Sequence, residues 1–315
     1  MSNPLSSIAV PQRYRTSANR QVLISNYPET APGVTPIQIV TLNRPEKLNA
    51  FTIEMINALE EFFTVVDVDD RVKVIILTGA GRTFSAGIDL SIDATERKNP
   101  PTRELRDPGG TLALSMYNCS KTIIVAYNGL SVGIGMTSTL AAAIRVASVK
   151  SEFGFPFARI GLTMESSSSF FLPRMVGYSN ATYLLTTGAR HKAESSVLQG
   201  IFAALVPEPQ DVLPRALEIA KDVLENVSTM AAHLNRQLIW RNADSAEKAH
   251  LVDSPLLYDM FGSKDHLEFK NSFFEKRKAK FTDLLSEDAP RTYPWWTELS
   301  VSTKPKARLQ ADSKL

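Results

Sequence analysis

Cysteine and histidine are scarce in this sequence. Cys119 is the single cysteine, and there are four histidines among 315 residues. One cysteine excludes an internal disulfide framework and a zinc site built on several cysteines, and it suggests a reducing compartment. An excess of one charge is also lacking, because 35 basic residues against 33 acidic ones leave a net charge of +2. Bulk electrostatics therefore do not recruit nucleic acid or a membrane surface, and a small anionic ligand has to be held by local basic groups.

Long hydrophobic runs are absent as well. No stretch approaches the 18 or more apolar residues of a membrane-spanning helix, so we expect no membrane span. The composition is instead that of a globular protein. Hydrophobic residues make up 43% of the chain, enough for one large domain or for a domain with a helical appendage.

Strand and helix patterns divide the chain into parts. Apolar or β-branched runs alternate with helical patterns as far as about residue 155, which predicts an α/β fold whose sheet is parallel after an initial hairpin. Residues 91–108 are charged and rich in proline, which suggests a mobile excursion over a site. We expect a flexible N-terminus at 1–20, an α/β core at 21–205, a helical region at 206–286, and a tail at 287–315 that Trp295 and Trp296 dock. The expected strands are 21–25, 37–42, 74–77, 122–127 and 145–148. The expected helices are one capped by Thr52, one that contains Leu112 and Met116, and then 137–144, 181–186, 193–199, 212–226, 230–240 and 265–285.

Two glycine-rich loops follow two of the expected strands. Gly133 and Gly135 free the backbone where a helix is expected to begin, so the N–H of Ile134 would point outward with the helix dipole behind it. In the other loop, Gly87 permits a close approach to the N–H of Ile88. Two such donors would form an oxyanion hole. The other interpretation of each loop is a tight turn needed only for packing.

A serine-hydrolase interpretation starts from Ser131. Residues 129–133 match the pattern G-x-S-x-G and lie between an expected strand and an expected helix, as a nucleophile elbow does. Such an enzyme needs an acid and then a histidine further along the chain. None of the histidines opens a loop after a late strand; they are His191, His233, His250 and His266. The hydrolase therefore stays a minor alternative.

Glu165 is a lone acid between an apolar loop with several glycines and a run that resembles the first turns of a buried helix. A carboxylate in this position has few ways to stay hydrated. It caps the helix N-terminus, where acids are favourable, or acts as a general base with a raised pKa, or does both.

Three spaced segments carry a resemblance to a known family. They are Leu-Asn-Arg-Pro-Glu-Lys-Leu-Asn-Ala at 42–50, Phe-Ser-Ala-Gly-Ile-Asp-Leu at 84–90 and Asn-Gly-Leu-Ser-Val-Gly-Ile-Gly at 128–135. Together they resemble the signature segments of the enoyl-CoA hydratase/isomerase (crotonase) superfamily, over roughly residues 20–285. The resemblance implies a spiral of ββα units, a helical C-terminal region used to form a homotrimer or a dimer of trimers, and acyl-CoA thioester substrates. It implies no metal, and no cofactor beyond the coenzyme A of the substrate.

The resemblance also assigns roles to individual residues. The family's oxyanion hole falls on the backbone N–H groups of Ile88 and Ile134. The residues implied to bind coenzyme A are Ala86, Asp89, Leu90 and Gly133, with Arg44, Lys47 and Lys276 as phosphate contacts, and the implied acyl pocket contains Phe157, Leu162 and Thr137. Lys276 belongs to a basic cluster whose other interpretation is solvated charge on a helix.

Two departures from the family pattern favour one reaction over another. Hydratases of the family carry two glutamates, and this sequence has Thr137 and Phe157 at those positions. Glu165 stands instead where the Δ3,Δ2-enoyl-CoA isomerase branch, which includes peroxisomal members, has its lone catalytic glutamate. The resemblance therefore implies a one-base shift of a double bond in fatty acid β-oxidation. The alternatives are a hydratase or isomerase for a specialised acyl-CoA of secondary metabolism, and a non-catalytic CoA-binding protein, against which Glu165 argues.

The two ends of the chain carry competing targeting features. Residues 1–28 contain three arginines and no acid, as mitochondrial transit peptides do, but Pro4 and Pro11 interrupt any amphipathic helix. The final tripeptide, Ser313-Lys314-Leu315, matches the peroxisomal C-terminal signal. We therefore expect import into the peroxisomal matrix through the receptor that binds this signal.

Overall fold

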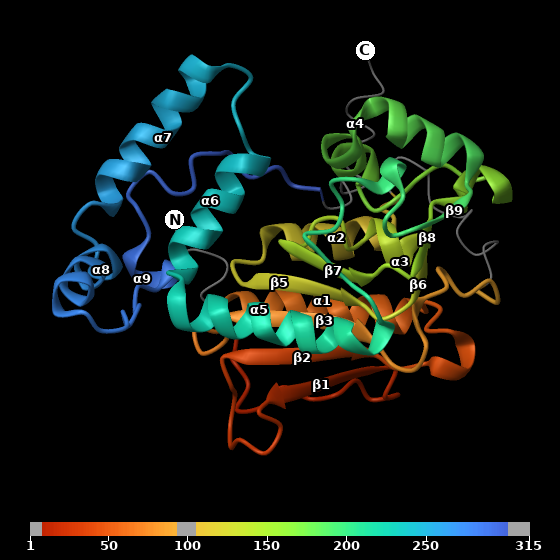
Figure 1. Ribbon diagram of the computed structural model, residues 1–315, viewed down its shortest axis with the longest axis horizontal. Helices are drawn as coiled ribbons and strands as arrows, with labels where there is room; N and C mark the ends of the chain where they lie inside the picture. The colour runs from red at the N-terminus through yellow and green to blue at the C-terminus, as the bar shows by residue number, and fades with distance from the viewer. Residues whose placement is uncertain (1–7, 93–104, 302–315) are drawn as a thin grey trace, which may run out of the picture.

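The structure is a computed structural model that describes residues 8–92 and 105–301. Two β-sheets form its centre, and helices cover them (Figure 1). The larger sheet is parallel except at its first strand, which pairs antiparallel with the second in the predicted hairpin. Its strands, in spatial order, are β1 (Val22–Tyr27), β2 (Ile37–Leu42), β3 (Val74–Gly79), β5 (Thr122–Tyr127), β7 (Ile144–Ser148) and β10 (Ala204–Val206).

Helices cover both faces of the larger sheet, which explains why its central strands are continuously apolar. Along β3, Ile75 and Leu77 belong to the cluster that includes α1 (Ile53–Asp67), while Val74 and Ile76 pack in the cluster that includes α5 (Val212–Asn226). Alternate side chains therefore fill two different cores. The predicted cap of α1 is confirmed, since the side chain of Thr52 accepts a hydrogen bond from the N–H of Met55 at 3.1 Å.

Most strands of the smaller sheet come directly after a strand of the larger sheet in the chain. Each of β3, β5 and β7 is followed by one short strand of the smaller sheet. This repeated pair of strands followed by a helical segment is the predicted ββα spiral. It brings the loops that follow β4 and β6 to one end of the molecule. The smaller sheet consists of β4 (Thr83–Ser85), β6 (Leu130–Val132), β8 (Glu152–Gly154) and β9 (Arg190–Lys192).

Four predicted helices have different bounds in the structure. The helix predicted at 181–186 is the last part of α4 (Ser168–Thr187). The helix predicted at 137–144 is only α3 (Ile134–Thr137), because the chain turns at once to enter the buried strand β7. Residues 193–199 contain only a single 3₁₀ turn, η6 (Ser196–Leu198). The helix predicted at 265–285 is α8 (Lys264–Glu275), which ends where Lys276 takes a left-handed conformation with φ 55°.

Two further helices frame the cavity described below. They are α2 (Pro108–Asn118) and α4 (Ser168–Thr187), the latter kinked at Gly177. One 3₁₀ helix, η5 (Pro156–Ile160), precedes α4. Figure 1 places α4 beside the smaller sheet, on the side of the molecule away from the C-terminal helices.

The C-terminal helices project from the body of the protein (Figure 1). The tail docks as predicted, because Trp296 stacks on the guanidinium of Arg241 at 4.0 Å and the hydroxyl of Tyr293 lies 3.1 Å from Nε2 of His233. The targeting tripeptide lies outside the described residues, and its role stays a prediction. None of the described helices combines the length and hydropathy needed to cross a bilayer. The C-terminal helices are α6 (Thr229–Trp240), α7 (Ala246–Met260), α8 and α9 (Leu285–Asp288).

The first described residues lie against the domain. Tyr14, inside the segment predicted to be flexible, is buried, and its hydroxyl donates to Oδ2 of Asp69 at 2.9 Å. Arg71 adds a hydrogen bond to the carbonyl of Pro11 at 2.6 Å. From these residues on, the chain is held by specific contacts.

Candidate active site

A cavity of about 360 Å³ lies where the loops after β4 and β6 meet the start of α2 and the segment before α4. Most of its lining is apolar, and Glu165 and Asp107 are the carboxylates among its described residues. The residues that line it are Ile53, Ile56, Ala86, Gly87, Ile88, Leu90, Asp107, Pro108, Gly109, Val132, Gly133, Ile134, Pro156, Phe157, Ile160, Leu162, Thr163 and Glu165.

Two hydroxyl groups hold the carboxylate of Glu165. Thr137 donates to Oε1 and Ser166 donates to Oε2. The Thr137 hydroxyl also lies 3.1 Å from the carbonyl of Gly133. A threonine hydroxyl has one proton, so it donates to an ionised Glu165, or donates to Gly133 and accepts from a protonated one. The site therefore accommodates both protonation states of the carboxyl without a change of partners.

The backbone directly after Glu165 is strained. Ser166 and Ser167 both adopt left-handed conformations, with φ of 58° and 54°. Residues with a Cβ rarely adopt this conformation, and it costs about 1–3 kcal/mol each. Ser167 is the N-cap residue of α4, and no side chain caps that helix. The predicted helix-cap role of Glu165 is therefore wrong, because the turn directs its carboxylate into the cavity instead of toward the N–H groups of α4.

The environment of Glu165 raises its pKa above the usual value. Burial is the main cause, since it disfavours the charged form. The hydrogen bonds from Ser166 and Thr137 oppose the shift, and the negative charge of Asp107 adds to it. A carboxyl with a raised pKa is a stronger base once ionised, which suits proton abstraction near neutral pH.

Ile88 and Ile134 line the same cavity, and their backbone N–H groups have no hydrogen-bond partner among the described residues. Phe51 bonds to the residues on either side of Ile88, through Gly87 O at 2.7 Å and Asp89 N at 2.9 Å, so the N–H of Ile88 points the other way. Ile134 is the first residue of α3, where an N–H has no acceptor within the helix. Two unpaired donors beside one base have the composition of an oxyanion hole.

Gly133 brings the two loops together. Its φ of 55° and ψ of −129° form a conformation that residues with a Cβ rarely adopt. A Cβ at Gly133 would lie 3.8 Å from the Cα of Gly87, so the loops are in van der Waals range there. The two loops therefore lie side by side, as two halves of one oxyanion hole would have to.

The other residues implied to bind substrate divide into three groups. Ala86, Leu90 and Gly133, proposed for coenzyme A, and Phe157 and Leu162, proposed for the acyl pocket, line the cavity. Thr137 does not line it, because its side chain is fully buried beneath Glu165 and acts as a hydrogen-bond donor to that carboxylate.

The basic residues proposed to contact phosphates lie outside the cavity lining. Nη1 of Arg44 pairs with Oδ2 of Asp89 at 2.9 Å and donates to the carbonyl of Ala50, so its guanidinium braces the loop after β4. Lys47 is exposed on the 3₁₀ turn η2 (Pro45–Lys47). Lys276 is the left-handed cap of α8, among the C-terminal helices, and within this single chain it does not reach the cavity.

Asp107 and Gly109 are site residues that sequence reasoning missed. The carboxylate of Asp107 caps α2 by accepting from the N–H of Gly110, and its Oδ2 accepts from the N–H of Ser166 at 3.1 Å. The backbone of Gly109 packs directly against the Glu165 carboxylate, since a Cβ there would overlap Oε2. Asp followed by Pro is a helix-start signal that marked this position. No local pattern shows that the helix starts at the base.

The structure does not support Ser131 as a nucleophile. Its side chain is fully buried, and its hydroxyl has no hydrogen-bond partner among the described residues. In the smaller sheet, Ser131 pairs with Phe153, which pairs with His191. Two strand spacings separate the serine from this histidine, about 9.5 Å, with a buried phenylalanine between them. A hydrolase would need these groups in hydrogen-bond contact.

Comparison with known proteins agrees with this geometry. The sequence profile described as "Enoyl-CoA hydratase/isomerase" matches residues 34–284. The chain belongs to the enoyl-CoA hydratase/isomerase family. It is 41% identical over 259 residues to the enoyl-CoA hydratase ACTT3 of Alternaria alternata, covering 82% of this chain and 87% of that protein.

Solved structures of the enoyl-CoA hydratase/isomerase family share the fold. The enoyl-CoA hydratase of Bacillus anthracis superposes with a TM-score of 0.71 at 24% identity, covering 83% of this chain and 98% of that one, which shows the fold alone. A monofunctional enoyl-CoA isomerase of M. smegmatis superposes with a TM-score of 0.59 at 28% identity, covering 73% and 98%. The relatives include both hydratases and isomerases, so family membership leaves the reaction undecided.

Proposed function

We propose that the protein is a Δ3,Δ2-enoyl-CoA isomerase that acts in fatty acid β-oxidation. The observation that carries this proposal is the pairing of one buried base, Glu165, with two unpaired amides, Ile88 and Ile134, in a largely apolar cavity. A shift of a double bond from C3–C4 to C2–C3 needs one base and one stabilised oxyanion, and these groups supply both.

The reaction balances with Glu165 as the only group that exchanges a proton. Its ionised carboxylate removes a proton from C2, which the thioester and the neighbouring double bond make acidic. The electron pair moves into a dienolate whose oxygen accepts hydrogen bonds from Ile88 N–H and Ile134 N–H. The protonated carboxyl then returns the proton to C4, so the double bond lies between C2 and C3 and the carboxylate is regenerated. Thr137 accommodates both states of the carboxyl.

Hydration is the second candidate reaction, for two reasons. The relative from Alternaria alternata is named a hydratase, and Asp107 places a second carboxylate at the cavity. Hydration needs a group that activates water in addition to the group that handles the C2 proton. Both carboxylate oxygens of Asp107 already accept hydrogen bonds from backbone N–H groups, those of Gly110 and Ser166. That arrangement favours a structural role for Asp107 and supports isomerisation as the main reaction.

Two variants separate the proposed reactions. The protein is incubated with 3-enoyl-CoA and with 2-enoyl-CoA, and wild type is compared with Glu165→Gln and Ser131→Ala. We expect double-bond migration by the wild type, a loss of more than about 10³-fold in Glu165→Gln because the sole base is gone, and near-normal rates in Ser131→Ala. Efficient hydration by Glu165→Gln would refute the proposed mechanism. Thioester hydrolysis that Ser131→Ala abolishes would establish the hydrolase.

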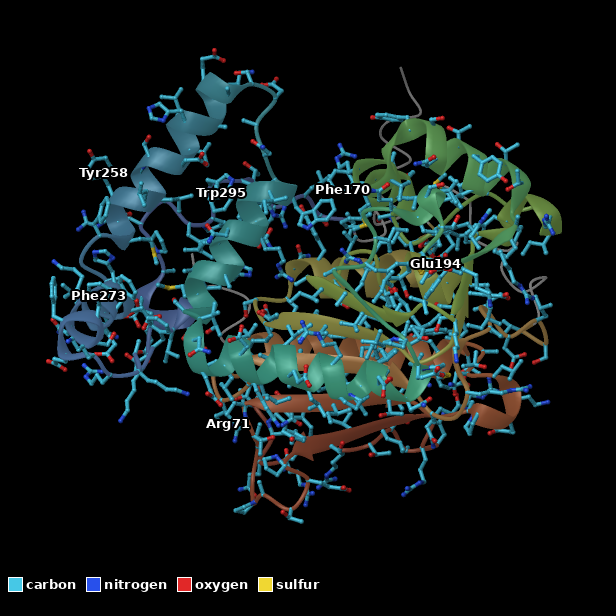
Figure 2. The ribbon with its side chains drawn as sticks, viewed as in Figure 1. Arg71, Phe170, Glu194, Tyr258, Phe273 and Trp295 are labelled. Carbon is cyan, nitrogen blue, oxygen red and sulfur yellow. The ribbon has the colours of Figure 1, made fainter. Side chains whose placement is uncertain are left out.

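Self-assembly through the C-terminal helices is part of the same proposal. The outer faces of α7 and α8 expose several large apolar side chains, including Tyr258 at 74% and Phe273 at 69% (Figure 2). Large apolar side chains exposed on two consecutive helices are typical of an interaction site. We propose that a second copy of the chain covers it in a homotrimer or a dimer of trimers. Sedimentation at micromolar concentration tests this, and a monomer would refute it.

A further inference from the structure

The start of α2 and the segment that carries Glu165 are tied together by one side chain. Oδ1 of Asp107 accepts from the N–H of Gly110, in the first turn of α2, and Oδ2 accepts from the N–H of Ser166 at 3.1 Å. We propose that Asp107 is a positioning residue for the catalytic base, one that fixes the turn after Glu165 against the first turn of α2. The proposal rests on the proposed role of Glu165 as the base.

The turn that Asp107 holds has a strained backbone, which would move to a lower-energy conformation if contacts did not restrain it. Ser166 and Ser167 are both left-handed, and strain of this kind persists only where surrounding contacts impose it. The Ser166 N–H, which Asp107 binds, belongs to the residue whose hydroxyl donates to Glu165. A change in this turn therefore moves both the carboxylate and one of its two hydrogen-bond donors.

Asp107 also acts on Glu165 through its charge. The elements packed against the Glu165 carboxylate contribute Asp107 from the start of α2, Thr137 from α3 and Ser166 from the segment before α4. Asp107 is the ionisable one of these three. Burial is the main reason that the pKa of Glu165 is raised, and the negative charge of Asp107 raises it further. Removal of that charge should make Glu165 a weaker base that ionises at lower pH.

Two substitutions at Asp107 keep the helix cap and remove the hold on the turn. Asparagine and serine are N-cap residues comparable with aspartate, so Asp107→Asn and Asp107→Ser should preserve α2. The amide of asparagine has only one acceptor oxygen, and serine is too short to reach both N–H groups. We expect kcat for 3-enoyl-CoA to fall about 10- to 100-fold in both variants, with KM within about threefold. The acid limb of the pH–rate profile should move to lower pH.

Ser245→Ala is the matched control. Ser245 caps α7, away from the cavity, through a hydrogen bond from the N–H of Lys248 at 3.3 Å. Its loss should lower the melting temperature and leave kcat and the pH profile unchanged. Wild-type kcat and pH profile in both Asp107 variants would overturn the proposal. A fall in kcat that merely follows a fall in melting temperature, with an unmoved acid limb, would also overturn it, because Asp107 would then be only a helix cap.

A measurement without turnover keeps this inference separate from the proposed function. The carboxyl infrared band that disappears in Glu165→Gln reports the ionisation of Glu165 directly. We expect that band to titrate at lower pH in Asp107→Asn than in wild type. If Glu165→Gln retains isomerase activity, the proposed function fails, while the infrared titration still decides whether Asp107 acts on Glu165. If Glu165→Gln is inactive and the band does not move in Asp107→Asn, the positioning role fails alone.

Discussion

Substitution of Gly109 by alanine should inactivate the enzyme without unfolding it. Gly109 lies in the first turn of α2 with its backbone against the Glu165 carboxylate, and a Cβ there would overlap both Oε2 of Glu165 and Oγ of Ser166. The carboxylate therefore has to move by a substantial fraction of an ångström or more. A misplacement of about 1 Å in a reacting group costs about 100-fold in rate, so we expect kcat to fall about 100-fold.

The stability of the Gly109→Ala variant should change little, because two effects oppose each other. Alanine is favoured over glycine in a helix by up to about 1 kcal/mol. Overlap in a packed site costs about 1–3 kcal/mol, some of which the shift of the carboxylate relieves. The net change is about 1 kcal/mol or less against the stability of a large domain, so most molecules stay folded at 25 °C.

The assay follows formation of the conjugated 2-enoyl thioester from 3-enoyl-CoA, with the melting temperature measured in parallel. Ser115→Ala is the control on the same helix, since Ser115 donates only to the carbonyl of Leu112 and does not line the cavity. A second test combines Gly109→Ala with Glu165→Asp, whose shorter side chain leaves room for the new methyl group. The double variant should lose less than the product of the single losses. A Gly109→Ala enzyme with more than about a third of wild-type kcat would refute the assignment of Glu165 as a fixed base.

The raised pKa of Glu165 leads to two further predictions. The ionised carboxylate is the active form, so kcat/KM should fall about tenfold per pH unit on the acid side of the pH–rate profile. This acid limb should lie above pH 4.5, the ordinary pKa of glutamate. A limb at or below pH 4.5 would contradict the argument that burial raises the pKa of Glu165. Because the pKa of Glu165 is higher in the folded state than in the unfolded state, ionisation of Glu165 at neutral pH lowers the free energy of unfolding. This destabilisation disappears at pH values below the unfolded-state pKa. Glu165→Gln should therefore be about 1 kcal/mol more stable than wild type at pH 7.5 in urea denaturation, and the difference should shrink as pH falls toward 4.5; a variant less stable at pH 7.5 would count against it.

Local sequence patterns were sufficient for the first five strands of the larger sheet, whereas β10 and the short strands of the smaller sheet were not predicted. Buried strands such as β3 and β5 are short continuous apolar runs, and glycines mark the loops that follow β4 and β6. These signals are local because strand burial and left-handed backbone conformation act on neighbouring residues. The helix bounds were less predictable, and α3 ends after four residues because the next strand has to begin.

The resemblance of the sequence to the family assigned Ile88, Ile134 and Glu165 to one site, because the local patterns alone left a packing turn at each loop and a helix cap at Glu165 as alternatives. Tertiary structure decided what surrounds the base. Asp107, Gly109 and Thr137 come from α2 and α3, far from Glu165 along the chain, and only packing brings them to its carboxylate. The raised pKa of Glu165 depends on that packing, because burial and neighbouring charge are properties of the folded site. The question whether the Glu165 carboxylate caps α4 was decided in the same way, because the strained turn at Ser166 directs it into the cavity.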